Sequence, residues 1–241
     1  MNKQKVYQIK NLTNFLFGKK AFTLAEVLIT IGIIGVVAAL TLPSLVANYR
    51  KKVVETRLAK FYSVINQALE LSEKDNGPKE HWDEMGKSGF EEDEEGNPDT
   101  NKPLPLPWFN KYLKPYLSYT KLDIDSAGKI MIYFSDGSLC LLSSTAIKIY
   151  PNAKDYKDYV TSDSGTRKNP WEISGIKYFT FDYDSLKGVE PYIRFWDGTA
   201  EDLYNNSALG CKEEVTNERA FCTKIIQMNG WKIPKDYPLR F

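Results

Sequence analysis

The stretch that decides the fold of this chain is residues 21–42, with the sequence AFTLAEVLITIGIIGVVAALTL. No charged residue occurs from Leu28 to Leu42, and the apolar character continues to Ala47. Roughly twenty apolar residues are enough for a helix to cross the hydrocarbon core of a membrane. One carboxylate, Glu26, stands at the start of this segment, where an unpartnered charge is costly and therefore indicates a functional role.

The residues that precede the apolar stretch are basic, with lysines at positions 3, 5, 10, 19 and 20 and no acidic residue among them. Such a prefix favours a cytoplasmic N-terminus. One interpretation is a secretory signal peptide cleaved after residues 45–47, although the apolar core is long for a signal and Pro43 interrupts the approach to that site. Residues 19–21 offer another cleavage site, before Phe22, which would leave the apolar helix on the mature protein.

Residues 19–29, KKAFTLAEVLI, resemble the cleavage and methylation motif of type IV pilins and type II secretion pseudopilins. In that family a prepilin peptidase cleaves before the phenylalanine and methylates the new N-terminus. The resemblance implies cleavage between Ala21 and Phe22 and N-methylation of Phe22. It also implies that Glu26, at the fifth mature position, acts in filament assembly, and that Pro43 bends the helix. One departure is Ala21, because the family prefers glycine before the cut.

Two roles are open for Glu26. Thr23 and Glu26 have the spacing of a capping box, in which the acid satisfies the first turn of its own helix. In the other role the carboxylate pairs with the free amine of Phe22 on a neighbouring subunit. The adjacent cleavage motif and Pro43 favour the assembly role, and the two roles are compatible at different stages.

Length and charge narrow the possible functions. The chain has 241 residues and a formal charge of +1, and removal of the five leader lysines would change this to −4. A nucleic-acid partner bound through bulk charge is therefore not expected. The length suits one membrane helix and one exported domain. We expect a leader over 1–21, a transmembrane and assembly helix over 22–47, an amphipathic helix over 48–76, and a β-rich globular domain over 77–241.

Three cysteines stand at positions 140, 211 and 222. Cys211 and Cys222 enclose a short loop, and a disulfide between them would stabilise the fold by about 3 kcal/mol. Three separate buried thiols remain an alternative, as does a bridge that uses Cys140. Cys140 is not expected to be a nucleophile, because it has no identifiable histidine partner.

Apolar residues at positions 54, 58, 61, 65 and 68/69 recur at three- and four-residue steps. This spacing predicts that the helix continues from Tyr49 to about Asp75 with one stripe to bury, and that residues 76–78, Asn-Gly-Pro, end it. Residues 79–107 are predicted as a loop, because an acidic run at 91–95 is followed by alternating prolines. A short helix is predicted over 108–113.

The remainder is predicted to be rich in strands. Residues 129–134 and 138–142 flank a turn at 135–137, which indicates a β-hairpin. Two further strands are predicted over 177–183 and 192–196. The predicted fold class is α+β, with a long N-terminal helix packed on an antiparallel sheet, which is also what the pilin resemblance implies. The run 229–241 is expected to close the domain as an extended tail, with partner binding as the alternative.

No catalytic arrangement is recognisable, since His81 is the one histidine and no triad or phosphate-binding loop accompanies it. An enzyme is therefore not expected. Asp123 with Asp125, and Asp182 with Asp184, are closely spaced carboxylates of the kind that calcium uses, but neither pair completes an EF-hand. Ordinary turns are the favoured interpretation of both. The pseudopilin resemblance adds slightly to Asp182 and Asp184 as calcium candidates, and no other cofactor is expected.

These observations predict a structural subunit of a type II secretion pseudopilus or a type IV pilus-like filament. Its partners would be prepilin peptidase, other pilin or pseudopilin subunits, an inner-membrane assembly platform and membrane lipid. The protein would lie in the inner membrane with one span, its N-terminus cytoplasmic before processing and its C-terminal domain periplasmic or extracellular. The alternative is a single-pass membrane-anchored extracytoplasmic binding domain that does not polymerise.

Overall fold

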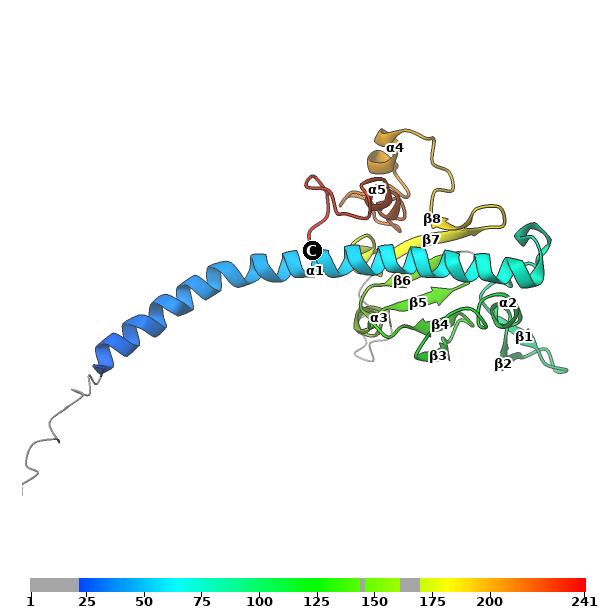
Figure 1. The fold of residues 1–241 in the computed structure, drawn as a ribbon, viewed down its shortest axis with the longest axis horizontal. Coiled ribbons are helices and arrows are strands. Elements are labelled where there is room, and N and C mark those ends of the chain that lie inside the picture. The colour runs from blue at the N-terminus through cyan, green and yellow to red at the C-terminus, as the bar shows by residue number, and fades with distance from the viewer. Residues whose placement is uncertain (1–21, 144–145, 161–169) are drawn as a thin grey trace, which may run out of the picture. The chain divides into compact units, whose positions relative to one another are not determined.

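The computed structural model describes residues 22–143, 146–160 and 170–241. Its longest element is helix α1 (Leu24–Asn76) (Figure 1). The chain divides into two compact units, with the boundary between Val46 and Ala47. The predicted end of the helix is correct, because α1 stops at Asn76 and Gly77 follows with φ +78°. Glycine adopts this left-handed conformation without the steric penalty of a side chain.

Within the second unit, α1 buries one stripe of side chains. As predicted, the stripe recurs at three- and four-residue steps, and it consists of Val54, Leu58, Phe61, Ile65, Ala68, Leu69 and Ser72. The ring of Phe61 stands edge-on to the ring of Phe181 in the sheet, with the ring centres 5.2 Å apart. Edge-to-face pairs of this kind add to the stabilisation from apolar burial. The amphipathic helix and the sheet therefore share one core.

The sheet contains six antiparallel strands arranged in chain order (Figure 1). They are β3 (Lys121–Ile124), β4 (Ile130–Tyr133), β5 (Leu139–Leu142), β6 (Ile147–Tyr150), β7 (Phe179–Asp184) and β8 (Gly188–Pro191). The predicted hairpin is β4–β5, with Ile130 opposite Leu142. The predicted α+β class, a long N-terminal helix with an antiparallel sheet, is confirmed.

The two faces of the sheet serve different cores. Successive side chains of a strand point to opposite faces, so Ile130 and Ile132 join the core shared with α1 while Met131 joins a second core. The second core includes Leu141 of β5, Tyr178 directly before β7, and Tyr156 of α3 (Ala153–Val160). The central strands are therefore buried on both faces, which explains why β5 is apolar at every position.

The prediction that residues 79–107 form a loop is wrong in part. The segment contains the short turn η1 (Lys79–His81) and a hairpin of β1 (Phe90–Glu92) and β2 (Pro98–Pro103). The acidic run fits the hairpin because the carboxylate of Asp93 accepts the backbone N–H groups of Glu95 and Asn97 across the turn. Helix α2 (Leu106–Tyr112) follows and corresponds to the predicted short helix.

The predicted strand over residues 192–196 is also wrong. The strand that follows β7 and pairs with it at the edge of the sheet is β8, and Asp184 closes the turn between them by accepting the N–H groups of Leu186 and Lys187. Beyond β8, Phe195 has φ +66°, a backbone conformation that β-strands do not adopt. Its side chain is 83% exposed. β8 could not be predicted from strand propensity, because it contains glycine and proline, which are rare in strands. Proline is nevertheless tolerated in an edge strand.

The C-terminal part of the chain covers the end of the sheet at β7 and β8. It contains η2 (Pro170–Ile173), α4 (Ala200–Asn205) and α5 (Cys222–Met228), and α5 contacts both strands. The tail after α5 closes the domain, as expected. Trp231 stacks on Phe181 with ring centres 6.1 Å apart, and Tyr237 and Leu239 are buried.

Candidate functional site

The start of α1 is a capping box. Thr23 donates its backbone N–H and its hydroxyl to Oε2 of Glu26, each at 2.7 Å, and the N–H of Glu26 donates to Oγ1 of Thr23 at 3.2 Å. These bonds satisfy donors that the first turn of a helix leaves unpaired. The capping role foreseen for Glu26 is thus present. Within the described residues no hydrogen bond reaches its other oxygen, Oε1.

The predicted cleavage site is described on one side only. Phe22 is 83% exposed and precedes the helix by two residues. Ala21 and the rest of the predicted leader, residues 1–21, lie outside the described residues. Cleavage and methylation at this position therefore stay predictions.

The residues after Glu26 form an exposed apolar surface. Large apolar side chains from Val27 to Val46 are exposed at nearly every turn of the helix. At a rise of 1.5 Å per residue, the part of α1 up to Val46 is about 35 Å long, which exceeds the ~30 Å of a hydrocarbon core. By length and composition, α1 could therefore cross a membrane.

Both threonines between Val27 and Val46 bond to the helix itself. The hydroxyl of Thr30 donates to the carbonyl of Val27 and that of Thr41 to the carbonyl of Val37, each at 2.9 Å. This arrangement suits an apolar surrounding, where an unsatisfied hydroxyl is costly. Pro43 lies inside α1 and lacks the N–H that would bond to the carbonyl four residues earlier. The bend predicted at Pro43 stays a prediction.

The calcium candidates are engaged in other contacts. Both carboxylate oxygens of Asp182 accept hydrogen bonds from the guanidinium of Arg194. Asp184 closes the β7–β8 turn, and the N–H groups of Lys187 and Leu186 hold the pKa of its carboxyl below the usual range against the opposing effect of burial. Among residues 22–143, 146–160 and 170–241, no group of three His, Cys, Asp or Glu side chains is placed to hold a metal.

The other aspartate pair also forms a turn. Asp125 accepts the backbone N–H groups of Ala127 and Lys129 at 2.9 and 2.8 Å, and Asp123 pairs with Lys121 at 2.7 Å. These contacts are typical of Asx turns and surface ion pairs. The favoured interpretation of both pairs as ordinary turns agrees with this geometry.

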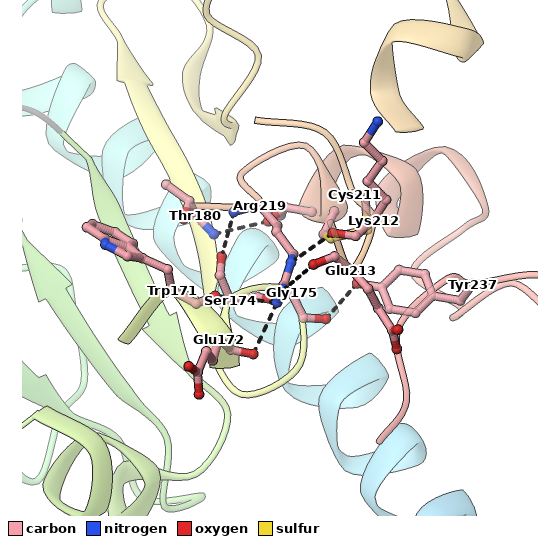
Figure 2. Close-up of a disulfide and its surroundings, with 12 residues drawn as sticks. Trp171, Glu172, Ser174, Gly175, Thr180, Cys211, Lys212, Glu213, Arg219 and Tyr237 are labelled. Atoms are coloured by element: carbon pink, nitrogen blue, oxygen red, sulfur yellow. Dashed lines mark hydrogen bonds between the residues drawn. A yellow bond between two sulfur atoms is a disulfide. The ribbon is translucent and has the colours of Figure 1, made fainter. Parts of the chain in front are cut away.

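The structure joins Cys211 and Cys222 by a disulfide, the pairing expected from the sequence (Figure 2). Cys140 is a free thiol on β5, completely buried, and this burial raises the pKa of the thiol well above its usual range. A thiol held protonated in this way is unreactive. Gly175 packs against the disulfide with φ +75°, and a Cβ there would lie 2.4 Å from Sγ of Cys222, so only glycine fits.

Arg219 fastens the disulfide-closed loop to the domain. Its side chain is almost fully buried and faces backbone carbonyls from two segments (Figure 2). Nε donates to the carbonyl of Lys212 at 2.9 Å and the terminal nitrogens donate to those of Glu172 at 3.1 Å and Glu213 at 3.2 Å. A buried cation is costly unless its donors are satisfied, and here the carbonyls satisfy them. The guanidinium thus links residues 171–174 to residues 211–222.

A cavity of about 220 Å³ lies between the sheet and this loop. Its floor includes Lys148 and Thr180, which are opposite each other in β6 and β7, and its wall includes Glu218 of the loop. The carboxylate of Glu218 accepts a hydrogen bond from Lys148 at 3.0 Å and another from the hydroxyl of Thr180. The cavity could hold a small polar molecule beside this ion pair.

Reasoning from the sequence did not identify Lys148, Thr180 or Glu218. Lys148 and Glu218 are 70 residues apart and belong to no recognisable motif. Arg219 was also missed, because nothing in its neighbourhood marks it as buried. The register of β6 with β7 and the path of the disulfide-closed loop bring these residues together, and neither can be deduced from local spacing.

Comparison with known proteins gives one family. A family model, described as "Family of unknown function (DUF6613)", matches residues 44–241. The match begins directly after Pro43, so it covers the second unit and leaves out the capping box. No curated protein and no solved structure matches the chain.

Proposed function

The chain belongs to this family of unknown function, and we propose that it is a prepilin-like structural subunit of a type II secretion pseudopilus or a type IV pilus-like filament. In this proposal the chain is cleaved before Phe22, methylated there, and assembled at the inner membrane through the first part of α1. The proposal rests on residues 19–43 and not on the family, whose match begins at residue 44.

The observation that carries the proposal is the position of Glu26 on an otherwise apolar and exposed helix. A carboxylate in the first turn of such a helix needs a cationic partner once it enters lipid. Cleavage before Phe22 would create a free amine four residues before Glu26. In a filament this amine would be available to the carboxylate of a neighbouring copy. Oε1 of Glu26, which the described residues leave without a hydrogen bond, is the acceptor we assign to it.

The exported domain agrees with this location. The lysines before Phe22 favour a cytoplasmic start, which directs residues after the span to the other side of the membrane. There the Cys211–Cys222 disulfide is stable, because disulfides persist in oxidising compartments. Partners in this proposal are prepilin peptidase, other subunits of the filament and the inner-membrane platform.

The experiment that tests the proposal is the mass of the N-terminal peptide of protein isolated from the membrane fraction. We expect a peptide that begins with N-methyl-Phe22. Retention of residues 1–21 would instead indicate an uncut anchor, and a start at Asn48 would indicate a secreted domain. Either result would overturn the filament proposal.

A single-pass anchored binding domain that does not polymerise is the second candidate. Two observations favour it: Glu26 already caps its own helix, and the cavity beside Lys148 offers room for a small ligand. Brief cross-linking in intact cells separates the candidates. A filament subunit gives a ladder of multiples of the mature chain, whereas an isolated anchor gives the monomer alone.

A further inference from the structure

The exit of α1 from its apolar segment is surrounded by positive charge that no ion pair in the described structure neutralises fully. Arg50, Lys51 and Lys52 are consecutive in α1, and successive residues of a helix point about 100° apart. These three side chains therefore ring the helix. Arg50 begins the ring about 6 Å along the helix beyond Val46, which is headgroup depth if the apolar segment spans the membrane.

The C-terminal tail adds cations to the same ring. The backbone N–H of Ile233 donates to Oε1 of Glu55 at 3.0 Å, and Lys232 approaches Oε2 of Glu55 at 3.4 Å. At the end of the chain, Nζ of Lys51 lies 5.9 Å from the ring centre of Phe241. Figure 1 shows the C-terminus beside α1. The fold therefore brings Lys232, and Arg240 next to Phe241, to the part of α1 around Lys51 and Glu55, although they are far from it in sequence.

We define the basic patch as Arg50, Lys51, Lys52, Lys232 and Arg240. Glu55 is the carboxylate that contacts it, and it is shared between Lys52 at 3.9 Å and Lys232 at 3.4 Å. The ion pairs of the described residues give these five cations one carboxylate, Glu55, and the α-carboxylate of Phe241 is a second anion near Lys51. A net positive charge therefore remains. The side chains of Lys52 and Lys232 are still 66% and 56% exposed, which leaves them free to meet another anionic surface.

An aromatic residue marks the same level. Tyr49 immediately precedes the ring of cations and is 69% exposed. Tyrosine is enriched at the interface between lipid and water, and clusters of Lys and Arg beside a membrane helix bind anionic headgroups. We propose that the basic patch docks the exported domain on anionic phospholipid headgroups of the membrane that α1 crosses. This proposal rests on the membrane-spanning part of the proposed function and not on polymerisation.

Contact between the basic patch and the headgroups would hold the domain in one orientation above the membrane. Without this contact, a domain attached through α1 alone would be free to tilt. Lys and Arg are usually enriched on the cytoplasmic side of a membrane span. Docking on anionic headgroups would explain why this chain also carries cations on the opposite side. The attraction would be electrostatic, so it should weaken at high ionic strength.

The test uses the full chain in lipid nanodiscs, with phosphatidylcholine alone or with one quarter phosphatidylglycerol. Lysines are acetylated by a short pulse of reagent and quantified by mass spectrometry. We expect Lys52 and Lys232 to react about threefold more slowly in the anionic discs at low salt, and equally in both discs at about 1 M salt. Lys74 is the internal control, since it is exposed on the same helix about 33 Å further along.

A matched pair of variants checks the assignment. Replacing Arg50 and Arg240 by glutamine should remove most of the protection at Lys52 and Lys232, whereas replacing Lys74 and Lys114 by glutamine should leave it intact. Equal labelling in both discs would overturn the proposal. Slower acetylation that appears only in discs holding two copies of the chain, whatever the lipid, would also overturn the proposal. It would indicate that the patch contacts a second copy.

The outcome is distinguishable from failure of the proposed function. A chain that does not co-elute with the discs lacks the membrane anchor, and both proposals then fall. A chain that inserts and shows lipid-dependent protection, but is never cleaved before Phe22, retains the docking patch without the filament.

Discussion

Asn66 of α1 forms two hydrogen bonds with the backbone of Val189 in β8: Oδ1 accepts the N–H of Val189 at 2.9 Å, and Nδ2 donates to its carbonyl at 2.9 Å. β8 is an edge strand, and the outward peptide groups of such a strand otherwise need water or another strand. The side-chain amide replaces that missing strand at one position. Gly188 makes this approach possible, because a Cβ there would lie 2.5 Å from Oδ1 of Asn66.

We therefore expect Asn66→Ala to lower the free energy of unfolding by about 2 to 3 kcal/mol, since it removes two partly buried hydrogen bonds. The corresponding drop in melting temperature is about 5 to 10 °C for a domain of this size. Thermal unfolding of the detergent-solubilised chain measures it. Gln67→Ala is the matched control, because Gln67 is exposed and its side chain bonds to Ser63 one turn earlier on the same helix. Equal shifts for the two variants would contradict the role of Asn66.

The two roles of Glu26 can be separated by a pair of substitutions. Glu26→Gln removes the charge and keeps a carbonyl oxygen that can accept the bonds from Thr23, as glutamine does in natural capping boxes. Thr23→Val removes the hydroxyl and keeps the charge. If Glu26 acts in assembly, Glu26→Gln should reduce filament incorporation at least tenfold while Thr23→Val reduces it little.

Incorporation is measured by cross-linking of mature protein in cells, after mass spectrometry has shown that each variant is cleaved equally and reaches the membrane. The reverse pattern, with normal incorporation of Glu26→Gln and loss for Thr23→Val, would leave Glu26 as a helix cap only. Glu26→Ala removes both roles and is expected to abolish incorporation without preventing membrane insertion.

Reduction of the Cys211–Cys222 disulfide should lower the free energy of unfolding by about 3 kcal/mol, because a loop of this length regains its entropy in the unfolded chain. Melting curves with and without reductant measure the change. All three cysteines are completely buried in the folded chain. Because reduction frees only the loop closed by Cys211 and Cys222, we expect alkylation to reach these two thiols as the loop opens, while Cys140 stays protected in the central strand β5. Rapid alkylation of Cys140 under these conditions would show that reduction opens the sheet as well as the loop.

Arg219→Met should destabilise the protein by more than about 2 kcal/mol, because it leaves several partly buried carbonyl groups without their donor. Arg194→Met is the control. Arg194 pairs with Asp182 at the surface with its side chain 50% exposed, so its loss should cost less than about 1 kcal/mol. Chemical denaturation of both variants tests the difference. Similar midpoints for the two would show that the carbonyl contacts of Arg219 contribute little.

Asp136 predicts a dependence of stability on acid pH. Burial would raise the pKa of this carboxyl, but hydrogen bonds from Ser138 and the ammonium of Lys60 outweigh burial and hold the pKa below its usual value. A carboxyl with a lowered pKa in the folded state stabilises the protein at neutral pH, and this contribution is lost as the pH falls from about 4 through the folded-state pKa.

Asp136→Asn should therefore be less stable than the parent chain at pH 7, with the difference shrinking below about pH 4. Melting temperatures of both chains across pH 2.5–7 provide the measurement. A constant difference over this range would mean that Asp136 contributes through its hydrogen bonds alone and not through its charge.

Several elements followed directly from local patterns. The buried stripe of α1 was predicted because the apolar residues from Val54 to Leu69 recur at helical spacing, and the end of α1 because Gly77 follows Asn76. The β4–β5 hairpin was predicted from apolar runs on both sides of Ser135-Asp136-Gly137. The strand over 192–196 failed for the opposite reason: its aromatic residues have strand propensity, yet the sheet took the less typical Gly188–Pro191 as its edge.

The sequence by itself determined the long helix, its apolar and amphipathic parts, the capping box at Thr23 and Glu26, and the α+β class. Each of these depends on residues within a few positions of one another, where periodicity, capping and turn chemistry act. Only the tertiary structure decided that Asn66 covers β8, that Lys148 meets Glu218, and that Lys232 and Arg240 lie near the cations Arg50, Lys51 and Lys52 of α1. These contacts link distant segments, and their geometry depends on strand register and on side-chain packing over the whole core, which no local pattern encodes.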